Sequence, residues 1–537
     1  MYVVTPSQSK KIDQRASAEF QIPGMILMEN AAIQAANVIR ERYPLSFFGR
    51  SGRVLVLAGC GNNGGDGLAV ARHLALSGYR VTVLILGRSG KNPSGDAGTN
   101  FAILKALQEK NAGQDGVSLT ILRLEDGQDP GRALALVREA SLIVDSLFGT
   151  GLDRPIAGNY AAVIGEANKS AGSVVAIDIP SGINGETAQI QGTAIRADDT
   201  VTFGYLKPGH ILFPGRNYSG RVHLRDIGFP PDSAKSVGAG MFTLDDREAA
   251  KQLRERPRDG HKGTFGRVAV LAGSTGLTGA ACMTSVSALR TGAGLVTLGI
   301  PSSLQPVLAG KLTEVMTMPL EDGGQGHLIP ESFPDVEELL KGKDVLALGP
   351  GCGKNPGVFE IIRNIFRRYH ISIVIDADGL NQISKDKDLL REYPAPVILT
   401  PHPGEMSTLT GIATEDILKR PVEIALETAR QYHVIVLLKG AASVVASPDG
   451  RVYLNRSGNS GMGTGGSGDV LTGMIASLVA QGYSPFDAAV LGCYLHGRSG
   501  DEAAGRIGEA GMTAGDLMHA IPHTLKRLYA LKQEETG

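Results

Sequence analysis

The chain has 537 residues, more than one hydrophobic core usually serves, so two or three domains are expected. Apolar residues make up 42% and charged residues 20%, and the net charge of −1 gives no electrostatic basis for binding nucleic acid or an anionic membrane surface. No window of 18 apolar residues is free of charge, so no membrane span is expected.

Glycine and cysteine usage favours ligand-binding loops in a reducing compartment. The 71 glycines are about twice the usual share and cluster after apolar runs, where they suit loops that hold ligands. None of the four cysteines forms a C-x-x-C pair, and the N-terminus lacks a basic region followed by an apolar stretch. We therefore expect a cytoplasmic protein without a disulfide framework.

The first half alternates short apolar runs with amphipathic stretches such as residues 67–77. Runs of Val, Ile and Leu suit strands that are buried on both faces of a parallel sheet. Strands are expected at residues 54–58, 81–86, 142–144, 174–177 and 201–203. The alternation predicts a Rossmann-like α/β domain of three layers, with helices on both faces of the sheet.

The first expected strand leads into a glycine-rich turn before the helical pattern, Gly59-Cys60-Gly61-Asn62-Asn63-Gly64-Gly65-Asp66-Gly67. Such a turn is typical of a dinucleotide or phosphate site, although the spacing is not that of G-x-G-x-x-G. The Asn-Asn-Gly-Gly-Asp core is more distinctive, since two amides and a carboxylate add specific hydrogen bonds.

Two further strands of this half end in aspartates, Asp145 and Asp178. Strand ends of a parallel sheet meet in one crevice, so the two carboxylates could hold a cation or move protons. The alternative, at about even odds for each residue, is that each aspartate caps a turn.

Together with Met28-Glu29-Asn30-Ala31-Ala32, these motifs resemble the NAD(P)H-hydrate epimerase family over residues 1–228. The resemblance implies a potassium site at Asn63, Asp145 and Ser181, and it makes Asp178 the acid/base candidate. It also implies hydrate contacts at Asn62, Asn63, Gly64, Gly65, Asp66, Gly149, Thr150, Gly151, Leu152, Asp153, Arg154, Pro155 and Asp178.

A domain boundary is expected near residues 228–245, where Gly228-Phe229-Pro230-Pro231 precedes a small, polar stretch. A second α/β pattern then occupies residues 235–537. Its strands are expected at residues 268–272, 295–300, 345–348, 373–375, 397–399 and 434–438.

The glycine run Gly463-Thr464-Gly465-Gly466-Ser467-Gly468 precedes Asp469 and an apolar helical pattern. Glycines let backbone N–H groups approach phosphates, and a helix N-terminus favours anions. Its field is expected to keep Asp469 ionised as a general base. A single aspartate at a helix start more often caps the helix, but a cap alone needs no such run.

Two more strand ends carry polar residues that face the same crevice. One continues into Lys439-Gly440-Ala441-Ala442-Ser443, and the other into Thr400-Pro401-His402-Pro403-Gly404-Glu405. Lys439 could contact phosphate as a point charge. Taken singly, Lys439 and Glu405 more often are solvated residues and His402 a structural histidine.

With Gly349-Pro350-Gly351-Cys352-Gly353 and Gly279-Ala280-Ala281, this set resembles the NAD(P)H-hydrate dehydratase branch of the ribokinase-like superfamily. The resemblance implies a ribokinase-like three-layer fold, Asp469 as base, ADP as phosphoryl donor, and Mg²⁺ near Glu405. It implies hydrate contacts at Ala280, Gly351, Gly353, His402 and Asp469, and nucleotide contacts at Lys439, Gly440, Ala441, Ala442, Ser443 and Gly468.

The domain order is similar to that of the prokaryotic bifunctional NAD(P)H-hydrate repair enzymes. That resemblance implies epimerisation of hydrated NADH and NADPH by the first domain and their dehydration by the second, with K⁺, Mg²⁺ and ADP, in a homo-oligomer. Two alternatives stay open: a small-molecule kinase with a fused nucleotide-binding domain, and a first domain that only senses or binds a partner.

Overall fold

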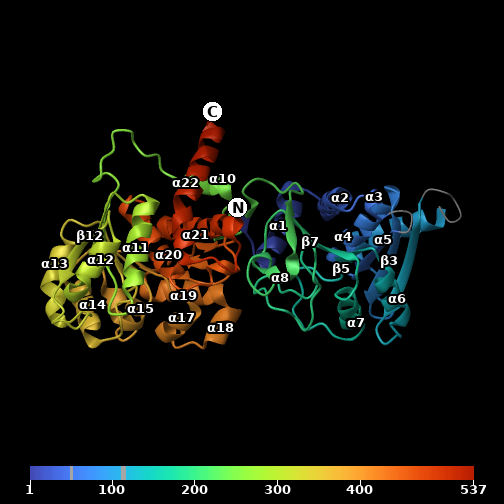
Figure 1. Ribbon diagram of the computed structural model, residues 1–537. Helices are drawn as coiled ribbons and strands as arrows, with labels where there is room; N and C mark the ends of the chain where they lie inside the picture. The colour runs from blue at the N-terminus through green and yellow to red at the C-terminus, as the bar shows by residue number, and fades with distance from the viewer. Residues whose placement is uncertain (49–51, 111–116, 537) are drawn as a thin grey trace. The chain divides into compact units, whose positions relative to one another are not determined.

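The computed structural model describes residues 1–48, 52–110 and 117–536, which fall into two compact units. One unit is Tyr2–Gly240, and the other comprises Met241–Gly537 together with Met1. Each unit is an α/β structure built on its own sheet (Figure 1). Within the described residues, none of the helices has the length and hydropathy that a bilayer span requires.

The N-terminal unit has a seven-stranded sheet with the order β4-β3-β2-β5-β6-β7-β8, and every neighbouring pair is parallel. Its strands are β2 (Arg53–Ala58), β3 (Arg80–Gly87), β4 (Leu119–Glu125), β5 (Leu142–Ser146), β6 (Ser173–Ile177), β7 (Asp199–Phe203) and β8 (Arg221–Arg225). The two edge strands, β4 and β8, were not predicted from the sequence. Both are partly exposed and mix polar with apolar residues, so they lack the continuous apolar run of a buried strand.

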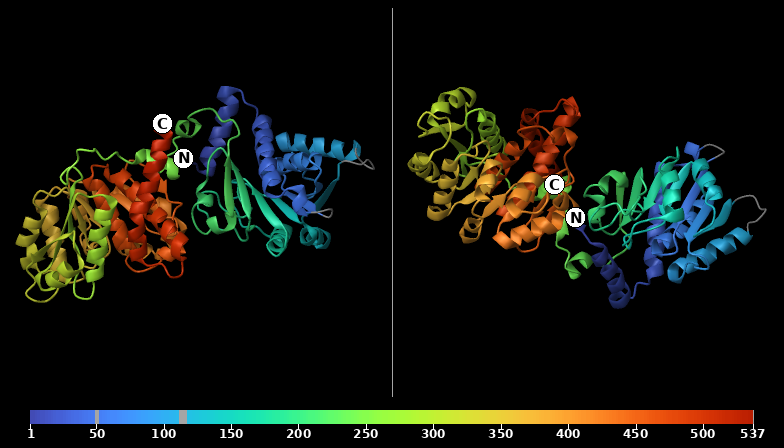
Figure 2. Two further views of the ribbon diagram at one scale, coloured as in Figure 1. Left: turned by 45° about the horizontal axis from the view of Figure 1, so that its top comes forward. Right: turned by 90° about the horizontal axis from the view of Figure 1, so that it is seen from below.

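Helices cover both faces of this sheet. Alternate residues of β2 point to opposite faces: Val54 and Val56 pack with α2 (Gly24–Arg42), α4 (Asn62–Leu76) and α5 (Gly95–Lys110). Leu55 and Leu57 pack instead with α6 (Gly131–Glu139) and α7 (Gly158–Ala167). The N-terminal helix α1 (Pro6–Phe20) begins at a capping box on Thr5. Figure 2 shows this layered arrangement from two further directions.

Helix α4 begins at Asn62, five residues earlier than the sequence suggested, so Asn62–Asp66 are helical rather than a loop. Glycine disfavours helix interiors, which is why the pattern was read as a turn. Close packing explains the glycine at position 64, because a Cβ there would lie 1.9 Å from the Gly59 carbonyl oxygen.

The C-terminal unit has a mixed sheet in which the order runs β9-β18-β17-β16-β15-β14-β13-β10-β11-β12. Its strands are β9 (Met241–Phe242), β10 (Arg267–Leu271), β11 (Leu295–Pro301), β12 (Met316–Leu320), β13 (Val345–Leu348), β14 (Ser372–Ile375), β15 (Val397–Leu399), β16 (Ile435–Leu438), β17 (Val444–Ala446) and β18 (Val452–Leu454). Neighbouring strands from β12 to β16 in this order are parallel. Strand β17 is antiparallel to both of its neighbours, β16 and β18. Four strands were not predicted from the sequence because they are too short or too polar to form a long apolar run: β9, β12, β17 and β18.

One face of this sheet carries the largest apolar core of the unit. It is formed with four helices: α11 (Thr278–Thr291), α20 (Ser467–Ala480), α21 (Pro485–Ile507) and α22 (Ala514–Thr536). Helix α20 packs on both α11 and α21, as Figure 1 shows. The buried side chains of α20 fix its N-terminus, and therefore Asp469, at the carboxyl ends of the strands.

Candidate active sites

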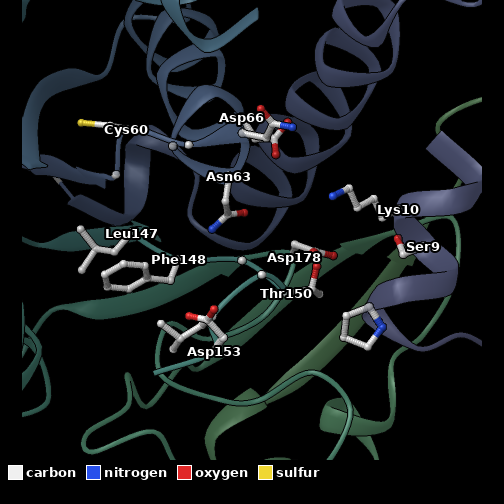
Figure 3. Close-up of a pocket in the computed structure, with 18 of the residues that line it drawn as sticks. Ser9, Lys10, Cys60, Asn63, Asp66, Leu147, Phe148, Thr150, Asp153 and Asp178 are labelled. Atoms are coloured by element: carbon white, nitrogen blue, oxygen red, sulfur yellow. The ribbon is translucent and has the colours of Figure 1, made fainter. Parts of the chain in front are cut away.

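The N-terminal unit has a cleft of about 1480 Å³ at the carboxyl ends of its strands. Figure 3 shows Asn63, Asp66, Asp178 and Thr150 around one space, with Lys10 of α1 facing them. Most of the hydrate contacts expected from the sequence line this cleft: Asn62, Asn63, Gly64, Asp66, Gly149, Thr150, Gly151, Leu152, Asp153, Arg154, Pro155 and Asp178. Gly65 does not line it, since it packs on Ala97 of α5, where a Cβ would lie 2.8 Å from the alanine Cβ.

Asp178 follows β6 and is held by a buried lysine. Lys207 Nζ donates to Asp178 Oδ1 at 2.6 Å, and Thr202 Oγ1 donates to the same oxygen at 3.0 Å. Burial opposes ionisation of Asp178, but the positive charge and hydrogen bond of Lys207 outweigh it and lower its pKa. Asp178 has a φ of 64°, a conformation that non-glycine residues rarely adopt, so its placement is imposed by the surroundings. It is therefore an ionised carboxylate at the cleft.

Asp66, on α4, has the opposite electrostatic environment. Burial raises the pKa of Asp66 well above its usual value, and the negative charges of Asp178 and Asp13 raise it further. Asp13 reaches the same cleft from α1. Two carboxyl groups with their pKa values pushed apart are the usual arrangement of an acid and a base.

The residues suggested for potassium are Asn63, Asp145 and Ser181. Asp145 is fully buried and accepts hydrogen bonds from the Ser181 backbone N at 2.7 Å and from Ser181 Oγ at 2.6 Å. Burial raises the pKa of Asp145 to about 6 despite these bonds. The amide oxygen and nitrogen of Asn63 are buried and have no partner among the residues that the structure describes. An unmet buried amide oxygen and a buried carboxylate are both oxygen ligands of the kind that a cation such as potassium binds.

In the C-terminal unit, Asp376 and Lys439 form the centre of the second site. Lys439 Nζ donates to Asp376 Oδ1 at 2.6 Å, while Thr472 Oγ1 donates to Asp376 Oδ2 at 2.8 Å. A Cβ on Gly468 would lie 3.3 Å from Lys439 Nζ and 3.5 Å from Asp376 Oδ2. The glycine run therefore lies directly against the lysine and aspartate.

Asp469 is the third residue of α20, and the N-cap position is Gly466, which makes no side-chain capping bond. The pKa of Asp469 is raised to about 7, mainly by burial. The negative charge of Asp376 also raises this pKa, and its effect is larger than the opposite effect of Lys439. The helix field was expected to favour the ionised form of Asp469, but burial and the like charge of Asp376 act against that field and raise its pKa. A pKa of about 7 suits a general base, since it can both accept and release a proton near neutrality.

Glu405 and His402 lie at the start of α17 (Pro403–Thr410), where they cap the helix. Glu405 Oε2 accepts from the His402 backbone N at 2.8 Å, and His402 Nδ1 accepts from the Gly404 and Glu405 backbone N atoms. The His402 side chain is exposed, and its Nε2 lies 3.4 Å from Glu405 Oε1. Glu405 Oε2 also lies 3.7 Å from Lys439 Nζ, so Glu405 belongs to the same charged cluster.

No group of three His, Cys, Asp or Glu side chains in the described part of the chain is arranged to hold a metal ion. Mg²⁺ commonly uses one or two carboxylates together with substrate phosphates, so Glu405 and Asp376 fit a magnesium ion that arrives with a nucleotide.

The remaining residues suggested for this site surround the same strand ends. A Cβ on Gly351 would lie 3.1 Å from Ala280 Cβ, so Gly351 is against the start of α11. The Gly353 backbone N donates to Asp378 Oδ2 at 2.9 Å. Gly440, Ala441, Ala442 and Ser443 form the turn between β16 and β17, and Ser443 Oγ donates to the Gly440 carbonyl at 3.2 Å.

Four residues of the two sites were not predicted from the sequence: Lys207, Thr202, Asp376 and Thr472. Asp376 directly follows a predicted strand, as Asp145 and Asp178 do, so the same strand-end argument would have found it. Thr472 and Thr202 lie within regular elements and carry no sequence signal for their contacts with aspartates.

Comparisons with known proteins cover both units. A family model described as NAD(P)H-hydrate dehydratase matches residues 268–523, and one described as YjeF-related protein N-terminus matches residues 24–209. The bifunctional NAD(P)H-hydrate repair enzyme Nnr of Moorella thermoacetica is 41% identical over 528 residues, which cover 98% of this chain and 97% of that protein. The enzyme of the same name from Thermofilum pendens is 37% identical over 532 residues, covering 98% and 97%.

One solved structure matches about half of the chain. The ADP/ATP-dependent NAD(P)H-hydrate dehydratase of Bacillus subtilis, co-crystallised with ATP and Mg²⁺, is 29% identical, with a TM-score of 0.47. The match covers 53% of this chain and 97% of that one.

Proposed function

Because the chain belongs to the bifunctional NAD(P)H-hydrate repair enzymes, we propose how its two sites divide the repair of hydrated NADH and NADPH. The chain is an NAD(P)H-hydrate epimerase fused to an NAD(P)H-hydrate dehydratase. The observation that carries our assignment of roles is that each site pairs a lysine with an aspartate at 2.6 Å, beside a second carboxyl group whose pKa is raised.

The substrate is a dihydronicotinamide ring that has gained water, with a hydroxyl on the carbon 6 that is bonded to the ring nitrogen. Hydroxide is a poor leaving group, so the dehydratase site converts it to a phosphate ester. Asp469 takes the hydroxyl proton while that oxygen attacks the terminal phosphorus of the nucleotide and the shorter nucleotide leaves. The ring nitrogen then expels phosphate, and loss of a proton from the neighbouring carbon restores the double bond.

Lys439 and the glycine run position the phosphates and neutralise charge in this step. Mg²⁺, held by Glu405 and Asp376 together with the phosphates, would stabilise the charge on the transferred group. ADP is our proposed donor. The geometry of Lys439, Gly440 and Gly468 suits a terminal phosphate of either ADP or ATP. The assay described below compares the two nucleotides as donors.

The epimerase site inverts carbon 6 without phosphorylation. Asp66, protonated because its pKa is raised, donates its proton to the hydroxyl, which leaves as water while the ring nitrogen supplies the electrons. Asp178, ionised beside Lys207, then takes a proton from a water molecule that adds to the other face. The proton returns to Asp66 through solvent, so the acid and base are restored.

Potassium is our proposal for Asn63, Asp145 and Ser181, supported by the unmet amide of Asn63 and the buried carboxylate of Asp145. Its charge would hold the start of α4 and the 145–151 loop in place around the hydrate. The expected homo-oligomer also stays a prediction, which light scattering on the purified chain tests.

The function is tested with a mixture of R and S hydrates supplied with ADP, with ATP or with neither, while reduced-nicotinamide absorbance is followed. We expect complete recovery of NADH and NADPH from both epimers with a nucleotide, fastest with ADP, and none without one. A stable phosphorylated product would favour the small-molecule kinase instead. If the N-terminal unit binds hydrate but does not interconvert the epimers, the result would favour the alternative in which this unit only senses a nucleotide or binds a partner.

A further inference from the structure

The cleft of the N-terminal unit is longer than the catalytic end requires. Besides Asp66 and Asp178, it is lined by Arg88 and Lys91, which follow β3, and by Tyr160 of α7. Figure 3 shows Asp178 and Lys10 toward one side of the cleft and Cys60, Leu147 and Phe148 toward the other. Cys60 adjoins the end of β3, because a Cβ on Gly87 would lie 2.8 Å from Cys60 Sγ. The end of β3 and Asp178 therefore bound opposite ends of one cleft.

The strand order indicates which part of a dinucleotide lies at each end. The run β4-β3-β2-β5-β6-β7 has the 3-2-1-4-5-6 order of dinucleotide-binding sheets, with the glycine-rich turn after the first strand, β2. In that arrangement, a residue after the second strand contacts the 2′ position of the adenosine ribose. The second strand here is β3, while Asp178, at the reacting ring, follows the fifth strand, β6.

The residues after β3 carry positive charge. A carboxylate after the second strand suits the 2′-hydroxyl of NAD, whereas an arginine suits the 2′-phosphate of NADP. In this chain residues 87–91 read Gly-Arg-Ser-Gly-Lys and contain no carboxylate. Among the residues that the structure describes, neither Arg88 nor Lys91 forms an ion pair. Both cations are thus free to bind an anionic group.

Neighbouring contacts shape this end of the cleft. Arg123 of β4 donates to the Lys91 carbonyl, and its Nη1 donates to Asn92 Oδ1 at 2.5 Å, so the 88–92 loop is fastened to the sheet. Tyr160 OH donates to the Leu86 carbonyl at 3.0 Å. The Tyr160 ring lies 4.8 Å from the ring of Phe148, and both line the cleft, which provides an aromatic surface for an adenine.

We propose that Arg88 and Lys91 bind the 2′-phosphate of the adenosine ribose, so that the epimerase site prefers the NADPH hydrate to the NADH hydrate. The inference rests on the proposed epimerase function and adds a specificity site to it. Acidic groups nearby include Glu125, which pairs with Arg123 at 3.2 Å, and Asp126 and Asp153, which also line the cleft. Asp126 follows β4, and its backbone N donates to the carbonyl of Gly87, the last residue of β3, at 3.1 Å, so this carboxylate lies beside the two cations and its contribution is tested below.

The test uses chromatography to measure the conversion of pure R hydrate into S hydrate by the full chain. Nucleotide is left out, so that the dehydratase is inactive. The Arg88→Ala/Lys91→Ala variant is compared with Arg132→Ala, an exposed arginine of α6 that does not line the cleft. Loss of two charge-assisted contacts should lower kcat/KM for the NADPH hydrate by about tenfold or more. The value for the NADH hydrate should not change, and neither should either value in Arg132→Ala.

Further variants and a probe separate this site from a general effect on folding. Arg88→Glu should reverse the preference, since a carboxylate there repels a 2′-phosphate and accepts from a 2′-hydroxyl. Asp126→Asn should preserve the NADPH preference. NADP⁺ should inhibit the exchange at lower concentration than NAD⁺, and the double variant should remove that difference.

Equal loss on both hydrates in the double variant would overturn the specificity site, and so would a wild-type chain with equal kcat/KM for the two. In both cases exchange itself would still establish the epimerase. Absence of any exchange in the wild-type chain would instead overturn the proposed function, together with this inference.

Discussion

Lys439 Nζ lies 2.6 Å from Asp376 Oδ1, and this ion pair lies directly against the glycine run that precedes Asp469. Burial lowers the pKa of the lysine, but the negative charges of Asp376 and Glu405 more than restore it, so the pKa of Lys439 is raised. A partly buried cation that one carboxylate already holds in place can turn toward phosphate oxygens with little loss of hydration. The pair therefore prepares the anion site and also sets the pKa of the base.

Asp376→Asn should shift the pH profile of the dehydratase. Burial first, and then the charge of Asp376, raise the pKa of Asp469 to about 7. A general base works when it is deprotonated, so the wild-type rate should rise through about pH 7. Removing the charge of Asp376 lowers the pKa of Asp469, and the acidic limb of kcat/KM should move to lower pH. An unmoved limb in a folded variant would contradict the coupling.

The matched comparison for Asp376→Asn is Asp388→Asn, an exposed aspartate that pairs with Arg391 on the surface. Asparagine at 376 can still accept from Thr472 Oγ1, so the fold contact is retained. KM for the nucleotide should change only in the Asp376 variant, since only there does Lys439 lose its hydrogen-bonded carboxylate and keep Glu405 alone, at 3.7 Å.

Asp469→Asn should abolish nucleotide-dependent recovery of NADH from both epimers. Loss of a general base typically lowers a rate by about 10²–10⁴-fold. Exchange between R and S hydrates, measured without nucleotide, should be unaffected because that site is in the other unit. Normal recovery of NADH by this variant would exclude Asp469 as the base.

Both units could be predicted from sequence as α/β structures because buried parallel strands are continuous apolar runs. The predicted strands of β2, β3 and β5 all form, whereas the edge strand β4 is mostly half-buried and mixes polar with apolar residues, so no apolar run predicted it. Site residues at strand ends, such as Asp178, could be identified by position. Lys207 could not, because its importance arises from burial beside Asp178, and a sequence states neither burial nor distance.

Asp178→Asn should leave repair of the S hydrate intact and slow consumption of the R hydrate. The asparagine keeps the side-chain volume but cannot take the proton from the adding water, so a fall of about 10²–10⁴-fold is expected for R. Asp232→Asn, on the exposed surface of the same unit, is the control. Equal loss on both epimers would indicate misfolding or a wrong role for Asp178.

Lys207→Met should move the acidic limb of the epimerase profile to higher pH. Lys207 outweighs the effect of burial and holds the pKa of Asp178 below its usual value. Without that charge, burial raises the pKa of Asp178, so the base becomes protonated at higher pH and activity is lost earlier as pH falls. Lys169→Met, an exposed lysine after α7, should not move the limb. An unchanged profile would show that Lys207 does not set the charge of Asp178.

Replacing K⁺ with Na⁺ should slow the epimerase and leave the dehydratase unaffected. The unmet amide of Asn63 and the buried carboxylate of Asp145 suit a cation, and a bound ion stabilises the folded state by about 2.7 kcal/mol at a hundredfold excess over Kd. The Tm of the N-terminal unit should therefore rise with K⁺ concentration. Burial raises the pKa of Asp145 to about 6, so protons compete with the ion and K⁺ affinity should fall as pH drops below about 6.

Asn63→Ala should remove the K⁺ dependence of both Tm and epimerisation, because it deletes the amide oxygen that the ion would bind. The matched control is Asn217→Ala, which truncates an exposed asparagine of the same unit and should keep both dependences. If wild-type Tm and exchange rate are the same in K⁺ and Na⁺, then Asn63 binds no potassium, and its buried amide must instead be satisfied by the hydrate or by water.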